Sequence, residues 1–184
     1  RMLDRVKAEK VVVAGDFKHE FSRNLTDEWI EAKQVLRFLR DRVTPILVRG
    51  NHDNYLATIL GDLNLKLQDR ADVGGYTIVH GHEEVSTLHP IVMGHEHPAV
   101  KLRDDLGAVV SVPAFLVSDG LIVLPAFSPL ALGVDVSSYP YLSPILNRTD
   151  IDGARVIGVD EKEGLLDFGR VRDLKKIRAA LLMK

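Results

Sequence analysis

The chain has 184 residues, of which 46% are hydrophobic and 27% are charged, with a formal net charge of −2 and no cysteine. This length and balance predict a single domain, residues 1–184, with enough apolar residues for a substantial core. The lack of cysteine excludes disulfides and thiolate metal sites, and the small net charge does not indicate tight non-specific nucleic-acid binding. The apolar runs are too short to span a membrane, and we expect a cytoplasmic location.

The first half of the chain alternates strand-like and helix-like segments. Residues 11–14 are a short apolar, β-branched run, and residues 46–48 are another. Between them, from Glu28 to Arg40, apolar residues recur at three- and four-residue spacing, which predicts an amphipathic helix packed on a sheet. Strand, helix and strand in this order predict a βαβ unit with a parallel pair of strands.

The second half changes to short strand-like segments at close spacing. Ser118-Asp119-Gly120 predicts a hairpin turn, and residues 156–169 predict a second, later hairpin. Residues 125–144 are rich in Pro and Ser and predict a long surface loop, while residues 172–183 predict a C-terminal helix. The fold expected is therefore α/β, with a parallel start, an antiparallel second half, and two β-sheets packed face to face with helices outside.

Polar residues follow four of these apolar runs at the point where each run ends. In open α/β sheets, ligand sites lie beyond the carboxyl ends of the strands, so we expect the four segments to converge. They offer carboxylate, amide and imidazole ligands without a thiolate, which favours Mn, Fe or Zn over Mg or Ca. The segments are Gly15-Asp16, Gly50-Asn51-His52-Asp53, His80-Gly81-His82 and Gly94-His95-Glu96-His97-Pro98.

The motifs G-D, G-N-H-D, H-G-H and G-H-x-H, in this order, resemble the signature of calcineurin-like metallophosphoesterases. G-H-E-H-P, followed later by L-P-A-F-S-P-L-A-L-G-V-D-V, resembles the archaeal and bacterial branch encoded near DNA helicases and DNA ligases. The resemblance implies a four-layer α/β/β/α sandwich of mixed sheets. It also implies hydrolysis of phosphoesters by a hydroxide that two divalent ions activate, with Mn the expected metal. We therefore expect a phosphodiesterase or nuclease. We also expect that it has a DNA helicase or ligase partner and forms a homodimer.

The same resemblance assigns metal ligands. Asp16 is the carboxylate that bridges the two ions, and Asn51, His80 and His95 complete the ligands of the second ion. His97 belongs to the first ion. A bridging carboxylate holds two such ions about 3.5–4 Å apart, and neutral imidazoles leave them electrophilic.

The resemblance also assigns the acid side of the reaction. His52 would protonate the leaving oxygen or stabilise the transition state, and Asp53 would hold His52 in orientation. On an extended strand Glu96 would point away from the histidines on either side of it, so we do not expect it to be a ligand. We expect loop or rim positions for the remaining histidines, which are His19, His82 and His89.

The sequence departs from the family at its first motif, because no D-x-H precedes Asp16. That motif would supply an Asp and a His to the first ion. Residues 1–10 have the spacing of the last helical turns of a βαβ unit, which predicts that the N-terminal strand is missing from this chain. We therefore expect one complete and one incomplete metal site, one tightly bound ion and little activity. Calorimetric titration with Mn²⁺ showing two equally tight sites would refute this expectation.

Two other functions remain open from the sequence. The first is a non-catalytic or weakly active scaffold that docks a DNA-processing partner, which the missing D-x-H favours and the presence of His52 and Asp53 opposes. The second is a zinc peptidase, suggested by the clustered His and Glu. The sequence, however, lacks the H-E-x-x-H motif that carries the zinc ligands on a helix of such enzymes.

Overall fold

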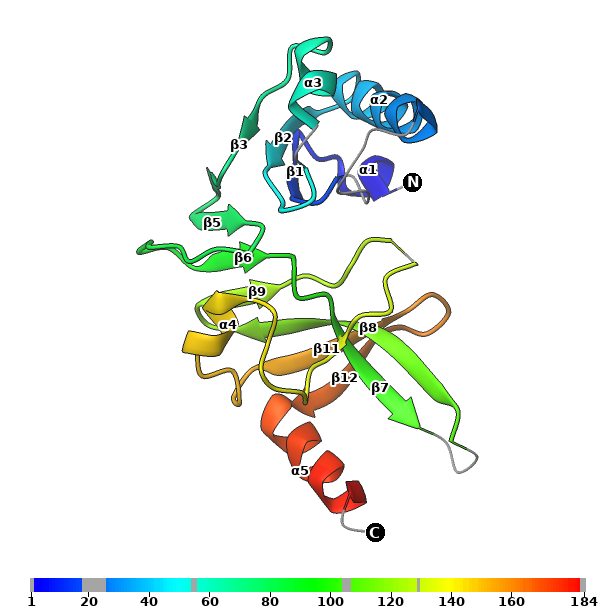
Figure 1. Cartoon of the computed structure of the whole chain (residues 1–184), viewed down its shortest axis with the longest axis vertical. Helices are drawn as coiled ribbons and strands as arrows, with labels where there is room; N and C mark the ends of the chain where they lie inside the picture. Colours follow the sequence, from blue (N-terminus) through cyan, green and yellow to red (C-terminus); the bar gives the residue numbers. More distant parts are fainter. Residues whose placement is uncertain (1, 18–25, 54–55, 104–106, 129, 183–184) are drawn as a thin grey trace. The chain divides into compact units, whose positions relative to one another are not determined.

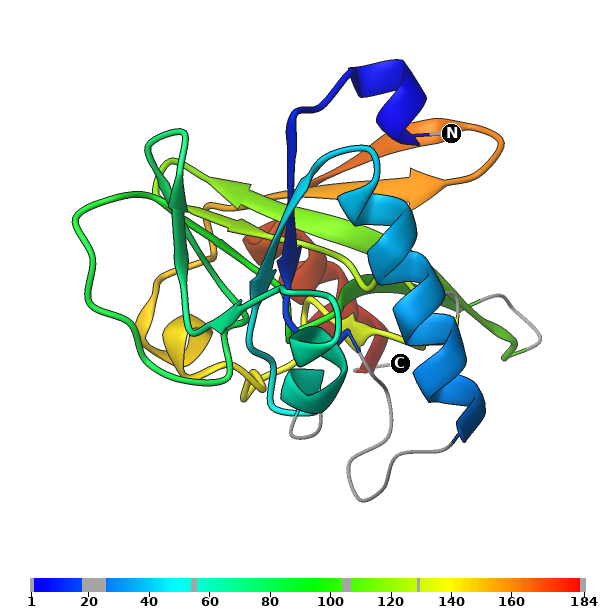
Figure 2. The same cartoon turned by 90° about the horizontal axis from the view of Figure 1, so that it is seen from above.

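The computed structural model describes residues 2–17, 26–53, 56–103, 107–128 and 130–182 (Figures 1 and 2). Clustering of contacts divides the chain into two compact units, Arg1–His80 and Gly81–Lys184. Each unit combines β-strands with helices, so the predicted α/β class is confirmed. Among the described residues, no helix is both long and apolar enough to cross a bilayer.

The first unit is built on a parallel sheet with strand order β1-β2-β3. Val12 of β1 pairs with Ile46 of β2, and Leu47 of β2 pairs with Leu67 of β3. Because α2 connects the parallel strands β1 and β2, the predicted βαβ unit is confirmed. The elements of this sheet and its helices are α1 (Met2–Val6), β1 (Lys10–Ala14), α2 (Thr26–Arg40), β2 (Thr44–Val48), α3 (Leu56–Gly61) and β3 (Leu67–Gln68).

The core of the first unit lies between the sheet and the two helices α2 and α3, which lie beside β1 and β2 in Figures 1 and 2. Leu36 of α2 is fully buried, as its helical spacing predicts. Val35, the residue before it, is 48% exposed, so it lies outside the buried face of α2. The buried residues of this cluster are Ala32, Leu36, Leu47, Leu56, Leu60 and Leu63.

A tight hairpin completes the first unit. Strand β4 (Ala71–Val73) pairs antiparallel with β5 (Tyr76–Val79). The turn residues Gly74 and Gly75 both have positive φ, of 61° and 81°, which glycine adopts without a steric penalty. This hairpin delivers His80 directly after β5.

The second unit holds a mixed sheet in which the strands follow the order β10-β7-β8-β9-β6. Strand β9 pairs antiparallel with β8 through the predicted turn at residues 118–121, but it pairs parallel with β6. The second half is therefore mostly antiparallel, with parallel pairing of β6 with β9 and of β7 with β10. These strands are β6 (Ile91–Met93), β7 (Pro98–Arg103), β8 (Val109–Ser118), β9 (Leu121–Val123) and β10 (Val134–Asp135).

The late hairpin and the C-terminal helix lie where the sequence predicts them. Strands β11 (Arg155–Asp160) and β12 (Gly164–Arg170) pair antiparallel, and β11 also pairs with β8. Helix α5 (Val171–Leu182) follows β12. The predicted loop at 125–144 is interrupted by β10, and helix α4 (Pro144–Arg148) begins at its end.

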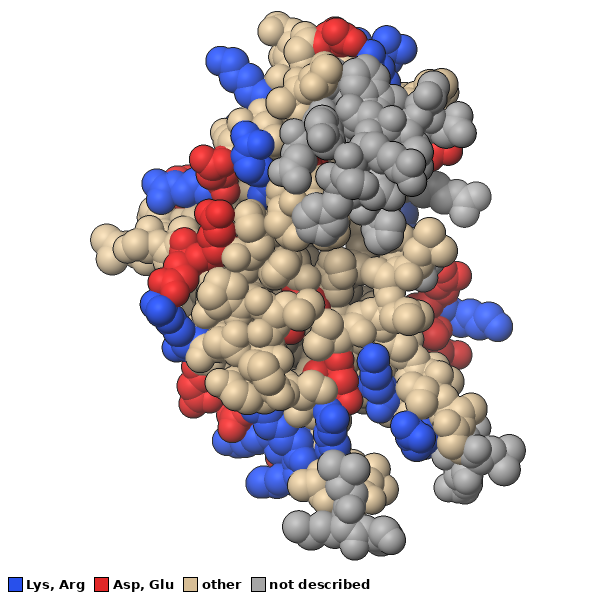
Figure 3. Space-filling model, in the orientation of Figure 1, with Lys and Arg blue, Asp and Glu red and all other residues tan. Residues whose placement is uncertain are grey.

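The visible surface carries both signs of charge. Figure 3 shows lysine and arginine side chains interspersed with aspartate and glutamate side chains on the face it draws. The basic run on α5 is tied to acidic and hydroxyl groups: Lys175 pairs with Asp152, and Arg178 contacts Asp135 and Ser138. These contacts hold α5 against two segments that precede it, one at Asp152 and the other at 135–138.

Candidate metal centre

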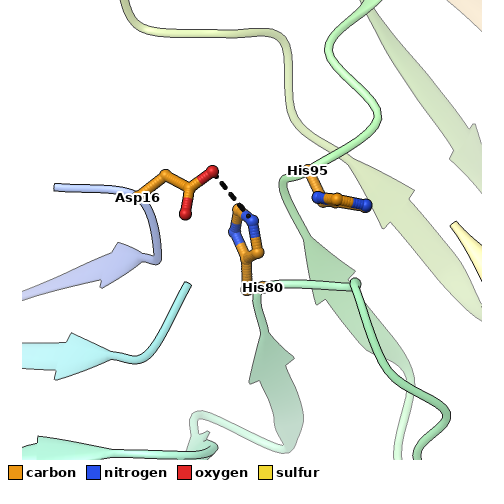
Figure 4. Close-up of side chains that lie close together, drawn as sticks. All are labelled: Asp16, His80 and His95. Atoms are coloured by element: carbon orange, nitrogen blue, oxygen red, sulfur yellow. Dashed lines mark ion pairs between the residues drawn. The ribbon is translucent and has the colours of Figure 1, made fainter. Parts of the chain in front are cut away.

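Three strand ends of the first unit bring their polar side chains together. Asp16 follows β1, Asn51 follows β2 and His80 follows β5. The Nε2 atom of His80 lies 3.1 Å from Oδ2 of Asp16 and 3.0 Å from Oδ1 of Asn51. Figure 4 shows the ion pair between Asp16 and His80 as a dashed line. Three of the residues that the sequence nominates as ligands therefore present one atom each to the same point.

The hydrogen bond on the other side of the His80 ring fixes its tautomer. Nδ1 lies 2.9 Å from the carbonyl oxygen of Ala14, which can only accept, so Nδ1 carries the proton. In neutral His80, the lone pair of Nε2 would then face two oxygen acceptors. Three acceptor atoms at this spacing need a cation among them, either a proton on Nε2 or a metal ion. This donor set fits a divalent metal with mixed oxygen and nitrogen ligands.

Without a metal, the surroundings of His80 favour a proton at that position. Burial is the largest single influence on the pKa of His80 and lowers it, but hydrogen bonds to Asp16 and Ala14 and the charges of Asp16 and Asp53 outweigh burial. The pKa of His80 therefore lies above its ordinary value of 6.5. For Asp16, burial raises the pKa, but the hydrogen bonds and charges of His80 and His52 lower it by more. The pKa of Asp16 therefore lies below its ordinary value of 3.8.

Two glycines allow the strand ends to approach so closely. A Cβ atom on Gly15 would lie 2.4 Å from Nδ1 of His80, and one on Gly50 would lie 2.1 Å from Oδ1 of Asp16. Side chains are not tolerated at such distances. Asp16 itself has a positive φ of 50°, an uncommon conformation for a residue with a Cβ that is often found at functional sites.

His52 lies beside the same carboxylate. Its backbone N–H donates to Oδ1 of Asp16 at 2.9 Å, and its Nε2 atom is 3.9 Å from Oδ2. The side chain of His52 is 27% exposed, so it is accessible from solvent. The position predicted for an acid is therefore next to the predicted metal ligand.

Asp53 has a clear structural role. Its carboxylate is fully buried and accepts hydrogen bonds from the backbone N–H groups of Gly50, at 2.8 Å, and Phe17, at 2.9 Å. These bonds hold the turn after β2 against the segment after β1. The role in orienting His52 that the resemblance implies stays a prediction.

In the second unit, residues 94–97 join β6 to β7 as a bend, and His95 is drawn in Figure 4. His95 and His97 have φ values of 62° and 49°, in the left-handed region. The expectation that they share one face of an extended strand is therefore wrong, because strand alternation does not apply to left-handed residues. Whether they ligate a metal stays a prediction.

Glu96, between these histidines, is buried rather than displayed. Only 2% of it is exposed, and its carboxylate accepts from the backbone N–H groups of Leu142, at 3.2 Å, and Ser143, at 2.9 Å. Burial raises the pKa of Glu96 above its ordinary value of 4.5, and the two hydrogen bonds offset only part of that rise. The sequence pattern did not predict that Glu96 is buried here. The one hint was the Ser-Pro pair at 143–144, which is typical of a helix start and so could have predicted the start of α4.

The remaining candidates divide by location. The ring of His82 packs edge-on against that of His95, with the ring centroids 6.1 Å apart. His82 therefore lies next to one of the predicted metal ligands. His89 is exposed, as expected. Arg49 pairs with Asp69 at the surface. His19 lies outside the described residues.

Comparison with protein-family models and with curated proteins gave no match. Among solved structures, the crystal structure of Pseudomonas putida nuclease MPE is similar, with a TM-score of 0.63 and 21% sequence identity. The similarity covers 90% of this chain and 77% of that chain. The chain therefore shares the α/β fold of that nuclease. At this identity the likeness establishes the fold, and the function rests on the residues of the site.

Proposed function

We propose that this protein is a metal-dependent phosphoesterase that acts on phosphodiesters, with nucleic acid as a candidate substrate. The observation that carries the proposal is the convergence of Asp16, Asn51 and His80 on one point where a cation is needed. The position of His52, 3.9 Å from Asp16, supports an acid beside that point. The fold likeness to a nuclease agrees with this function and does not carry it.

Each residue has a role that its contacts support. Asp16, Asn51 and His80 would hold a divalent ion, with Mn the expected metal and Fe or Zn compatible with the same ligands. Such an ion supplies Lewis-acid stabilisation of phosphoryl charge and activation of water. The Ala14 carbonyl holds the His80 ring so that Nε2 faces the ion. His52 would donate a proton to the leaving oxygen.

The G-H-x-H motif supplies further candidate ligands. We propose His95 as a further ligand of the ion that Asn51 and His80 would hold, and His97 as a ligand of the other ion that Asp16 would bridge. This part of the proposal rests on the G-H-x-H motif, because imidazole pairs are common ligands in two-metal phosphoesterase sites. A helicase or ligase partner, a homodimer and a cytoplasmic location stay proposals of the same kind.

The test is hydrolysis of bis(p-nitrophenyl) phosphate with and without Mn²⁺, in the wild-type chain and in Asn51→Ala, His80→Ala and His52→Ala. We expect activity that depends on Mn²⁺ and is lost in the first two variants. His52→Ala should lower kcat by about 10²–10⁴-fold, the usual contribution of a positioned acid. His89→Ala, an exposed histidine outside the cluster, is the matched control and should keep full activity.

Full activity in Asn51→Ala or His80→Ala would contradict the assignment. Mn²⁺ binding without hydrolysis of phosphodiesters or phosphomonoesters would favour the scaffold alternative. Running p-nitrophenyl phosphate in parallel separates a diesterase from a monoesterase.

A further inference from the structure

The bend that joins β6 to β7 has an unfavourable backbone. His95 and His97 both lie in the left-handed region, at φ 62° and 49°, where residues with a Cβ are uncommon. Such conformations persist only where surrounding contacts hold them, and they gather at functional sites. The bend therefore needs an anchor close to the two histidines.

Glu96 is that anchor by position and by contacts. It lies between the two left-handed histidines, and its side chain is 2% exposed. A buried carboxylate is costly unless hydrogen bonds satisfy its oxygens. Here one oxygen accepts from the N–H of Leu142 at 3.2 Å, and the other accepts from the N–H of Ser143 at 2.9 Å. Both oxygens are thus used to fix the bend to the chain that precedes α4.

Ser143 extends the anchor to a second motif. Its side chain is fully buried, and Oγ donates to the carbonyl oxygen of Gly81 at 2.6 Å. Gly81 precedes His82, whose ring packs against that of His95. Gly81 has a φ of 107°, a backbone conformation that glycine adopts without a steric penalty. One serine therefore links the H-G-H and G-H-E-H segments through Glu96.

We propose that Glu96 is a positioning residue whose carboxylate, held by the Leu142 and Ser143 N–H groups, sets the arrangement of the His95 and His97 imidazoles. The importance of that arrangement for metal binding rests on the proposed function. Glu96 itself is directed at backbone N–H groups and acts through its two neighbours. A purely structural role, in which Glu96 only stabilises the fold, is the alternative that the experiment must separate.

The main variant is Glu96→Gln, which keeps the shape of the side chain. A glutamine has one acceptor oxygen, and its NH₂ group would face a backbone N–H donor, so one of the two bonds must break. The matched control is Val156→Ala in β11, a fully buried position of the same unit in a strand that pairs with β8 and β12, where the substitution should lower stability. Thermal unfolding of both variants measures the stability that each one loses.

Two readouts then separate positioning from stability. The first is NMR of the imidazole Cε1–H signals in metal-free protein; we expect Glu96→Gln to shift those of His95 and His97 and leave that of His89 unchanged. The second is Mn²⁺ affinity by calorimetry, which should fall by about tenfold or more, as it does when partners behind metal ligands are lost. Val156→Ala should leave the imidazole signals and the affinity at their wild-type values.

The proposal is overturned if Glu96→Gln matches Val156→Ala in both readouts at comparable loss of stability. If Glu96→Gln does not fold, Leu142→Pro removes one donor N–H at a residue whose side chain is 58% exposed. That variant should shift the same two imidazole signals, and unchanged signals would overturn the proposal. If wild-type protein binds no Mn²⁺, the proposed function fails, while the imidazole signals still decide the role of Glu96.

Discussion

His80 shows how much of the candidate site follows from the hydrogen-bonding capacity of single residues. Its Nδ1 proton is committed to the Ala14 carbonyl, so Nε2 must meet the Asp16 and Asn51 oxygens through a proton or a metal. Protons and metal ions should therefore compete for this position, because a metal ligand must be deprotonated. We expect Mn²⁺ affinity to rise as pH increases through the elevated pKa of His80.

The same pair predicts a pH dependence of stability in metal-free protein. The pKa of His80 is raised, so its contribution is full below the unfolded value of 6.5 and is lost as pH rises through the folded value. The pKa of Asp16 is lowered, so its contribution is full above 3.8 and is lost as pH falls through the folded value. Both contribute between these two unfolded values.

Urea unfolding in EDTA tests this prediction with wild type and Asp16→Asn. The variant should be less stable than wild type at about pH 5.5, and the difference should shrink as pH rises through the pKa of His80. A difference that does not change between these conditions would show that the ion pair does not form.

Gly50→Ala tests the close approach of the strand ends. The new Cβ would lie 2.1 Å from Oδ1 and 2.2 Å from the backbone N of Asp16, so the backbone must shift. We expect a loss of about 1–3 kcal/mol in the free energy of unfolding, typical of overpacking, together with weaker Mn²⁺ binding. Gly61→Ala is the control, because a Cβ there has no atom within 4 Å among the surroundings described. Equal behaviour of the two variants would contradict the geometry around Asp16.

At the scale of elements, periodicity predicted most strands and helices because burial of one face imposes a repeat of two or 3.6 residues. It failed where conformation depends on contacts distant in sequence. The bend at 94–97 is left-handed because the buried Glu96 carboxylate meets the chain before α4, which apolar spacing does not record. Strand β10 pairs over only two residues, Val134 and Asp135, too few to show an alternating pattern.

Helix α2 offers a prediction at this scale. Leu36 is fully buried against the sheet, whereas Val35, one residue earlier, is 48% exposed. Leu36→Ala should lower the free energy of unfolding by about 2–5 kcal/mol through lost burial and the cavity left behind. Val35→Ala should change it by only about 0.5 kcal/mol, as is usual for surface positions. Urea unfolding measures both, and similar losses in the two variants would mean that α2 packs with a different face.

For the whole molecule, the fold class follows from the order of elements, and the fold likeness to the Pseudomonas putida nuclease MPE agrees with it. The predicted metal ligands divide between the units by sequence: Asp16, Asn51 and His80 belong to the first, and His95 and His97 to the second. Because Asp16 and Asn51 follow the neighbouring parallel strands β1 and β2, the sequence could predict that these two lie near one another. The second group depends on a left-handed bend, so sequence spacing predicted its residues and not their conformation.

The most direct test of the account is calorimetric titration of metal-free protein with Mn²⁺ in wild type, His80→Ala and His89→Ala. We predict that wild type and His89→Ala bind with the same affinity and that His80→Ala binds at least about tenfold more weakly, since losing a ligand should cost no less than losing a partner behind one. Equal affinity in His80→Ala and wild type would show that Asp16, Asn51 and His80 do not hold the metal, and would contradict the central claim.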